Sequence, residues 1–146
     1  MDILVIEDNP LKREKIVEYL NQKSGLNIQE AASYNSGLTL AQERKFDLLI
    51  LDMSMPTFDR SDSTHGGRFR AVAGKEIVAR LKRSNKLVPF VVLTGFTDFR
   101  TDTQNISLEE IDSILAGLGE IYKGCVFFDS TNSVWKEKLS LVLETL

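Results

Sequence analysis

Short apolar runs alternate with amphipathic segments along this chain. Residues 3–6 form an apolar run rich in β-branched side chains, and an acidic, turn-forming stretch at 7–10 follows it directly. Runs of this kind, bounded by turn residues, are typical of buried strands. The pattern therefore predicts a first strand that ends in an acidic loop.

The segment from Leu11 to about Gln22 predicts a helix, because its apolar residues are spaced roughly as on one helical face. The charged residues 12–15 are expected on the other faces of this helix. The expected buried face consists of Leu11, Ile16, Val17, Tyr19 and Leu20.

The rest of the chain continues the alternation. The strongest strand signal lies at 46–51, whose last four residues are apolar throughout, as in strands that are covered on both faces. Ser107, with Glu110 three residues later, resembles a capping box and opens a helix that Gly124 is expected to end. The other predicted strands are 26–31, 88–93 and 126–128, and the other predicted helices are 34–44, 75–83 and 134–146.

Five strands that alternate with five helices favour an α/β fold. Parallel neighbours need crossover connections, which helices supply, so we expect a five-stranded parallel sheet, doubly wound, with helices on both faces. The 146 residues suit one domain, 1–146. Two long polar stretches, at about 57–73 and 96–106, are expected to be long loops.

Composition narrows the class of protein. Eighteen Lys and Arg against 21 Asp and Glu give a net charge of −3, which argues against direct, charge-driven binding of nucleic acid. No apolar run is long enough for membrane insertion, and the first ten residues lack the features of a signal peptide. The single cysteine, Cys125, has no partner for an internal disulfide. We therefore expect a cytoplasmic protein.

Acidic residues follow the predicted strands. Glu7 and Asp8 follow the first strand, Asp52 follows the third, and Thr94 ends the fourth. Ligands of doubly wound sheets bind beyond the carboxyl ends of the strands, so we expect these side chains to share one crevice.

Three carboxylates in one crevice repel each other, and a bound cation removes that cost. A set of oxygen ligands suits Mg²⁺ or Mn²⁺. Zinc is disfavoured, since the lone histidine, His65, and Cys125 lie in unrelated segments.

With a metal ion at Glu7 and Asp8, Asp52 is placed to act as a nucleophile toward a phosphoryl group. The metal neutralises charge on the transferred oxygens. Thr94 is then placed to donate a hydrogen bond from its hydroxyl to the new phosphoryl group. This bond would signal the presence of the phosphoryl group to the rest of the domain.

Three motifs in this order resemble the receiver domain of bacterial two-component response regulators. They are ILVIEDN at 3–9, DLLILDMSMP at 47–56 and VVLTG at 91–95. The resemblance spans essentially the whole chain and implies the sheet order 2-1-3-4-5. It also implies that Asp52 is the phosphorylation site and Thr94 the switch residue, with Glu7, Asp8, Asp52 and the backbone carbonyl of Ser54 as metal ligands.

The chain departs from the family after the fifth strand. Receivers usually carry a lysine there that pairs with the phosphoryl group, whereas Ser130 or Thr131 stands at about that place here. A hydroxyl donates a hydrogen bond but supplies no charge, so its bond is weaker. Arg60, Arg68 and Arg70, all in the 57–73 stretch, are candidate replacements.

The 57–73 stretch is itself an insertion relative to ordinary receivers, and 96–106 is also lengthened. Long loops in compact domains are usually functional or disordered. A lid over the site, a docking surface and a flexible excursion all remain open for the insertion.

The leading hypothesis is a stand-alone receiver, not an enzyme, which accepts a phosphoryl group on Asp52 from a histidine kinase or phosphotransfer protein. It signals to a downstream effector protein, and a homodimer is compatible with this hypothesis. The alternative is a pseudo-receiver adaptor that binds partners without regulated phosphorylation. A metal-dependent phosphatase is disfavoured, because Ser54 stands where such enzymes typically carry a second acid.

Overall fold

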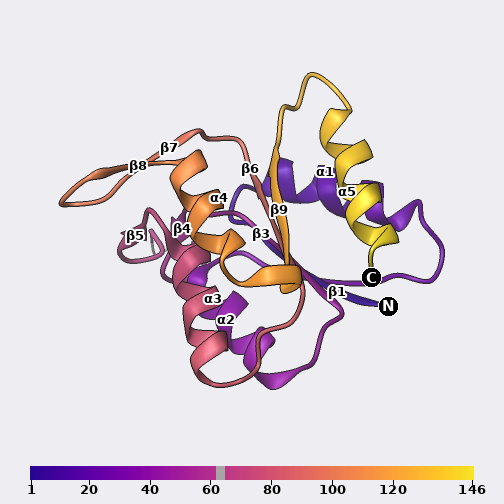
Figure 1. Ribbon diagram of the computed structural model, residues 1–146, viewed down its shortest axis with the longest axis horizontal. Helices are drawn as coiled ribbons and strands as arrows, with labels where there is room; N and C mark the ends of the chain where they lie inside the picture. Colours follow the sequence, from indigo (N-terminus) through magenta and orange to yellow (C-terminus); the bar gives the residue numbers. More distant parts are fainter. Residues whose placement is uncertain (62–64) are drawn as a thin grey trace.

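The computed structural model describes residues 1–61 and 65–146 and is built on a five-stranded parallel sheet (Figure 1). The strand order is β2-β1-β3-β6-β9, and every neighbouring pair is parallel. This confirms the predicted order. The strands are β1 (Asp2–Ile6), β2 (Asn27–Ala31), β3 (Leu48–Leu51), β6 (Phe90–Thr94) and β9 (Tyr122–Phe127).

Helices cover both faces of the sheet, as predicted (Figure 1). On one face lie α1 (Pro10–Asn21) and α5 (Val134–Glu144). On the other face lie α2 (Tyr34–Glu43), α3 (Ala73–Arg83) and α4 (Leu108–Ala116), which a 3₁₀ turn at Gly119–Ile121 follows.

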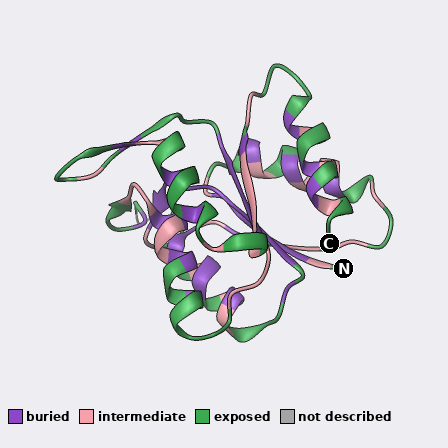
Figure 2. Ribbon diagram, viewed as in Figure 1, coloured by how far each residue is buried: buried purple, intermediate pink, exposed green. Residues whose placement is uncertain are grey.

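Each central strand divides its apolar side chains between two cores. Ile3 and Val5 of β1 pack in the core with α1 and α5, whereas Leu4 and Ile6 pack in the core with the other three helices. This is the alternation of a strand covered on both sides, and it explains the continuous apolar runs. Figure 2 shows the buried residues concentrated along the sheet and on the helix faces turned toward it.

Local capping places the start of α1 directly after the acidic loop. The Asn9 side chain accepts hydrogen bonds from the backbone N–H groups of Leu11 (3.0 Å) and Lys12 (3.2 Å), and Pro10 occupies the first helical position. Farther along the chain, the Ser107 hydroxyl accepts from the Glu110 N–H (3.1 Å), which confirms the predicted cap of α4.

The two long polar stretches contain short antiparallel hairpins, where the sequence predicted only loops. In the first, β4 (Met55–Pro56) pairs with β5 (Phe69–Arg70). In the second, β7 (Asp98–Arg100) pairs with β8 (Asn105–Ser107), and this hairpin projects from the body of the protein (Figure 1). Residues 62–64, including Asp62, lie outside the described residues.

The strand β9 begins earlier than predicted. We expected a helix up to Gly124 and a strand at 126–128, but α4 ends at Ala116 and β9 begins at Tyr122. Gly124 lies inside the strand with a φ of 102°, a conformation that glycine adopts readily. The pairing of β9 with β6 shifts register at this point, so the sequence around Gly124 does not alternate as a regular strand would.

Among residues 1–61 and 65–146, none of the helices has the length and apolar character needed to cross a bilayer.

Candidate functional site

Three carboxylates meet at the carboxyl ends of β1 and β3. Oxygen atoms of Glu7, Asp8 and Asp52 all lie within 4.8 Å of one another. They meet because β1 and β3 are neighbours that pair Ile6 with Leu51, one residue before Glu7 and Asp52 respectively. Glu7 and Asp52 are buried and Asp8 is half-buried. The structure thus brings together the acidic side chains that the sequence predicted to converge.

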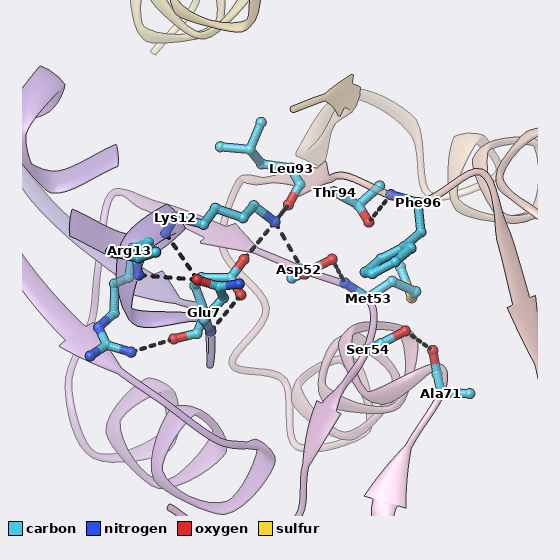
Figure 3. A network of polar contacts seen from close by, with 12 residues as sticks. Glu7, Lys12, Arg13, Asp52, Met53, Ser54, Ala71, Leu93, Thr94 and Phe96 are labelled. Carbon is cyan, nitrogen blue, oxygen red and sulfur yellow. Dashed lines mark hydrogen bonds and ion pairs between the residues drawn. The ribbon is translucent and has the colours of Figure 1, made fainter. Parts of the chain in front are cut away.

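A buried lysine lies among these carboxylates (Figure 3). Lys12 Nζ is 2.5 Å from Glu7 Oε1 and 3.1 Å from Asp52 Oδ2, and it donates a hydrogen bond to the Leu93 carbonyl (2.8 Å). The Lys12 residue is only 8% exposed. Lys12 lies in α1, the helix that follows the acidic loop. Its positive charge partly balances the negative charge of the acidic cluster.

Sequence reasoning missed Lys12, which it placed on a solvent-facing side of α1. The structure reverses this assignment: Lys12 faces the core while Leu11 is 72% exposed. Lys12, Ile16 and Leu20 are spaced four residues apart and all three are buried, so they share one helical face. That spacing was visible in the sequence and could have identified the lysine.

The environment of Glu7 favours its protonated form. Burial raises the pKa of the Glu7 carboxyl well above its usual range, and the negative charge of Asp52 raises it further, while Lys12 opposes both effects. Glu7 Oε2 accepts a hydrogen bond from the Asn9 N–H (3.0 Å). Among the described residues, Oε1 has the ion pair with Lys12 but no well-formed hydrogen bond. A metal cation bound at Oε1 would coordinate an oxygen that lacks a well-formed hydrogen bond.

Backbone contacts hold Asp52 in place. Its Oδ1 accepts a hydrogen bond from the Met53 N–H (2.6 Å), while Oδ2 faces Lys12. The start of α3 lies close to this loop, because the Gly74 N–H donates a hydrogen bond to the Met53 carbonyl (2.9 Å). A Cβ at position 74 would lie 2.5 Å from the Asp52 carbonyl oxygen, so this approach requires glycine.

Thr94 lies at the end of β6, next to β3 in the sheet, with its side chain fully buried. Its hydroxyl oxygen accepts a hydrogen bond from the Phe96 N–H (3.3 Å), and its carbonyl accepts from the Phe128 N–H (2.8 Å). Figure 3 shows the Thr94 side chain on the Asp52 side of this strand end. Thr94 is therefore connected both to the segment before β7 and to the end of β9.

Ser54 follows Asp52 by two residues and is also buried. Its hydroxyl donates to the carbonyl of Ala71 (2.7 Å), which joins the loop after β3 to the segment before α3. This contact fixes the loop in which the backbone carbonyl of Ser54 is an expected ligand of the metal.

Phe128, not a hydroxyl residue, occupies the site-facing position after β9. Its ring centroid lies 5.6 Å from Lys12 Nζ and 5.0 Å from the Trp135 ring centroid. Ser130 and Thr131 are exposed, and Thr131 hydrogen-bonds to Asp129 instead of the acidic site. The placement of Ser130 or Thr131 at the usual lysine position is therefore wrong, because both are exposed and Phe128 is the residue that contacts Lys12.

The three loop arginines have different partners. Arg60 reaches the acidic site, with its guanidinium 3.3 Å from Asp8 Oδ2. Arg68 pairs with Asp102 (3.5 Å) and Arg70 pairs with Glu76 (2.8 Å). Of these three arginines, Arg60 lies at the rim of the site. The buried positive charge in the site belongs to Lys12 of α1.

The donor set fits a hard divalent cation. Three carboxylates with a half-exposed member, Asp8, match the few-carboxylate, water-completed coordination that Mg²⁺ prefers, and Mn²⁺ accepts the same ligands. His65 is exposed and Cys125 lies within β9 on a different part of the sheet, so neither adds a soft ligand. The residues that would hold the ion are Glu7, Asp8 and Asp52.

Comparison with known proteins agrees with this arrangement. The chain is 27% identical over 143 residues to the Detocs response regulatory protein DtcB of Enterobacter cloacae, a match that covers 95% of each chain. It is 28% identical over 140 residues to protein y4jR of Sinorhizobium fredii, covering 93% of this chain and 92% of that protein.

Among solved structures, the response regulator TrrA of Thermotoga maritima, in complex with Mg²⁺ and BeF, superposes with a TM-score of 0.63. The match covers 97% of both chains at 22% identity, which supports the shared fold. Residues 3–116 match the family model described as the response regulator receiver domain. The chain belongs to the receiver-domain family of two-component response regulators.

Proposed function

We propose that the chain accepts a phosphoryl group on Asp52 from a phosphohistidine of a histidine kinase or phosphotransfer protein. The observation that carries this proposal is the acidic trio, with its oxygens within 4.8 Å and Asp52 at the end of a central strand. Glu7, Asp8, Asp52 and the backbone carbonyl of Ser54 hold the Mg²⁺ or Mn²⁺ ion.

In the transfer, a carboxylate oxygen of Asp52 forms a bond to phosphorus as the bond from phosphorus to the donor imidazole nitrogen breaks. The electron pair of the broken bond stays with the imidazole, which leaves as a neutral ring because its other nitrogen carries a proton in the donor. The Met53 N–H holds Asp52 Oδ1 and keeps the carboxylate oriented. The bound metal supplies charge neutralisation at the transferred oxygens.

The phosphoryl group is sensed at Thr94. When the Thr94 hydroxyl pairs with a phosphoryl oxygen, its hydrogen bond with the Phe96 N–H is the contact that changes. One residue after Phe96, the Thr97 carbonyl accepts a hydrogen bond from the Leu108 N–H (2.8 Å) at the start of α4. This short path links the site to the β7–β8 hairpin and to α4.

The output is a changed protein-binding surface. We propose one receiver domain over 1–146, with the enlarged segments 57–73 and 96–106 beside the site, acting in the cytoplasm on a separate effector protein. A homodimer through the α4–β9–α5 face is compatible with this role. Neither nucleic acid binding nor membrane insertion is part of the proposal, and the chemistry at Asp52 is not enzymatic turnover.

The second candidate function is an adaptor that binds partners irrespective of phosphorylation, and it is not favoured. The complete acidic trio and the Asp52 position favour the phosphoacceptor instead.

Phosphoryl-adduct formation separates the two functions. Incubation with Mg²⁺ and acetyl phosphate should give an adduct that is stable in acid and labile to hydroxylamine, and Asp52→Asn should abolish it. Failure of the folded, Mg²⁺-binding protein to form any adduct would rule out the phosphoacceptor role. Partner binding that is identical for wild type and Asp52→Asn would favour the adaptor.

A further inference from the structure

We propose that Lys12 is the cation that pairs with the phosphoryl group on Asp52. In this chain the phosphoryl-facing charge comes from the first turn of α1 and not from the end of β9, where Phe128 stands. This inference rests on the proposed function and deepens it, because it names the residue that replaces the missing lysine.

The contacts of Lys12 place its ammonium group between two strand ends. It binds Asp52 Oδ2 at 3.1 Å, directly after β3, and the Leu93 carbonyl at 2.8 Å, one residue before Thr94. Figure 3 shows Lys12, Asp52 and Thr94 around the same strand ends, so a phosphoryl group that bridges Asp52 and the Thr94 hydroxyl would lie beside this ammonium group. Lys12 therefore needs little movement to reach the new oxygens.

The charges also favour a move of the Lys12 ammonium group from the Asp52 carboxylate to the phosphoryl group. Phosphorylation of Asp52 forms an acyl phosphate, which removes the charge of the carboxylate and adds phosphoryl oxygens that carry more negative charge than the carboxylate did. A lysine ammonium has three donors on a flexible stem, so it can turn from the carboxylate to the phosphoryl group while keeping its bond to the Leu93 carbonyl. Such charge-assisted bonds are stronger than a bond from a neutral hydroxyl.

Phe128 occupies the position after β9 that faces the site, while the positive charge comes from α1. Its N–H is bonded to the Thr94 carbonyl, so its backbone is fixed at the strand end, and its ring faces Lys12 Nζ at 5.6 Å. An apolar ring there shields the ammonium from water and provides no competing charge. A lysine at position 128 would lie beside the same site, because the Phe128 ring is next to Lys12 Nζ.

The competing role for Lys12 is that of a fixed counter-ion for Glu7, which would affect folding but not phosphoryl recognition. Beryllofluoride with Mg²⁺ distinguishes the two, because it mimics the phosphoryl group without a covalent donor. Its binding can be followed by ¹⁹F NMR and by fluorescence of the single tryptophan, Trp135, which contacts Phe128.

The experiment compares wild type, Lys12→Met, Phe128→Lys and the double variant, with Lys15→Met as a control at an exposed lysine of the same helix. Lys12→Met should weaken beryllofluoride binding about tenfold or more, the loss expected for a charged hydrogen bond. It should leave the affinity for Mg²⁺ alone equal or higher. The double variant should recover most of the loss, and Lys15→Met should match wild type.

Equal beryllofluoride binding by wild type and Lys12→Met would overturn the assignment of Lys12. If Lys12→Met fails to fold, Lys12→Gln, which keeps a polar side chain without the charge, serves for the same comparison. Wild type that binds Mg²⁺ but no beryllofluoride would refute the proposed function itself, together with this inference.

Discussion

The backbone of Gly74 lies so close to Asp52 that a Cβ on Gly74 would be 2.5 Å from the Asp52 carbonyl oxygen. The same glycine donates its N–H to the Met53 carbonyl at 2.9 Å. The first residues of α3 are thereby packed against the loop that presents the phosphoacceptor. A change in this contact must move either α3 or the Asp52 loop.

Gly74→Ala should therefore lower both stability and metal binding. Relieving the clash requires a backbone shift, and we expect the free energy of unfolding to fall by about 1–3 kcal/mol, as measured by urea denaturation. Gly95→Ala is the matched control, because a Cβ there would be 3.4 Å from the Phe128 carbonyl oxygen and so nearly in ordinary contact. Equal stability for the two variants would contradict the predicted role of the close approach.

Removing Lys12 should destabilise the protein in the absence of metal. Lys12→Met leaves the buried Asp52 carboxylate without its counter-ion, and breaking such a pair costs about 3–5 kcal/mol. Asp52→Asn in the Lys12→Met background should recover part of the loss, because it removes the uncompensated charge. Urea denaturation in EDTA of wild type, both single variants and the double variant measures this coupling, and strictly additive effects would contradict it.

Cys125 should react slowly with alkylating agents at neutral pH. Burial raises the pKa of its thiol to about 11, and the charge of Asp112 adds to the effect, so little reactive thiolate is present at pH 8. The alkylation rate by iodoacetamide should keep rising with pH up to about 11 in the folded protein. In denaturing urea, where the burial is lost, the rate should level off near the ordinary cysteine pKa of about 9. A plateau at the same pH in both states would show that the fold does not protect the thiol.

Thr94→Val should separate phosphoryl binding from its transmission. The valine keeps the shape of the buried side chain but has no hydroxyl to accept the Phe96 N–H or to donate to a phosphoryl oxygen. We expect beryllofluoride to bind, while hydrogen exchange at 96–108 no longer responds to it. Thr103→Val, at an exposed position within the β7–β8 hairpin, should leave that response intact. A normal exchange response in Thr94→Val would place the switch elsewhere.

The sequence predicts the sheet and the meeting of Glu7, Asp8 and Asp52, because these rest on strong apolar runs and on the parallel arrangement of strand ends. The strand order comes from the resemblance to receiver domains. The prediction from polarity placed Lys12 outward, although its spacing with Ile16 and Leu20 marks the buried face of α1. Lys12 is buried since its carboxylate partners lie inside the site, and this tertiary contact outweighs its polarity, whereas Leu11 has no such partner and stays exposed. The shape of the chain around Gly124 and Phe128 depends on a register shift, which local patterns do not encode.

Arg60 gives a further prediction on metal affinity. Its guanidinium pairs with Asp8 at 3.3 Å, and the arginine side chain is 54% exposed, so the ion pair is partly screened by water. Arg60→Ala frees an oxygen of Asp8 for the metal and should raise Mg²⁺ affinity, by less than about fivefold since such surface pairs contribute at most about 1 kcal/mol. Arg68→Ala is the control, because Arg68 pairs with the exposed Asp102 away from the trio. Isothermal titration with Mg²⁺ measures both variants, and weaker binding by Arg60→Ala would mean that Arg60 helps to hold Asp8 in its metal-binding position.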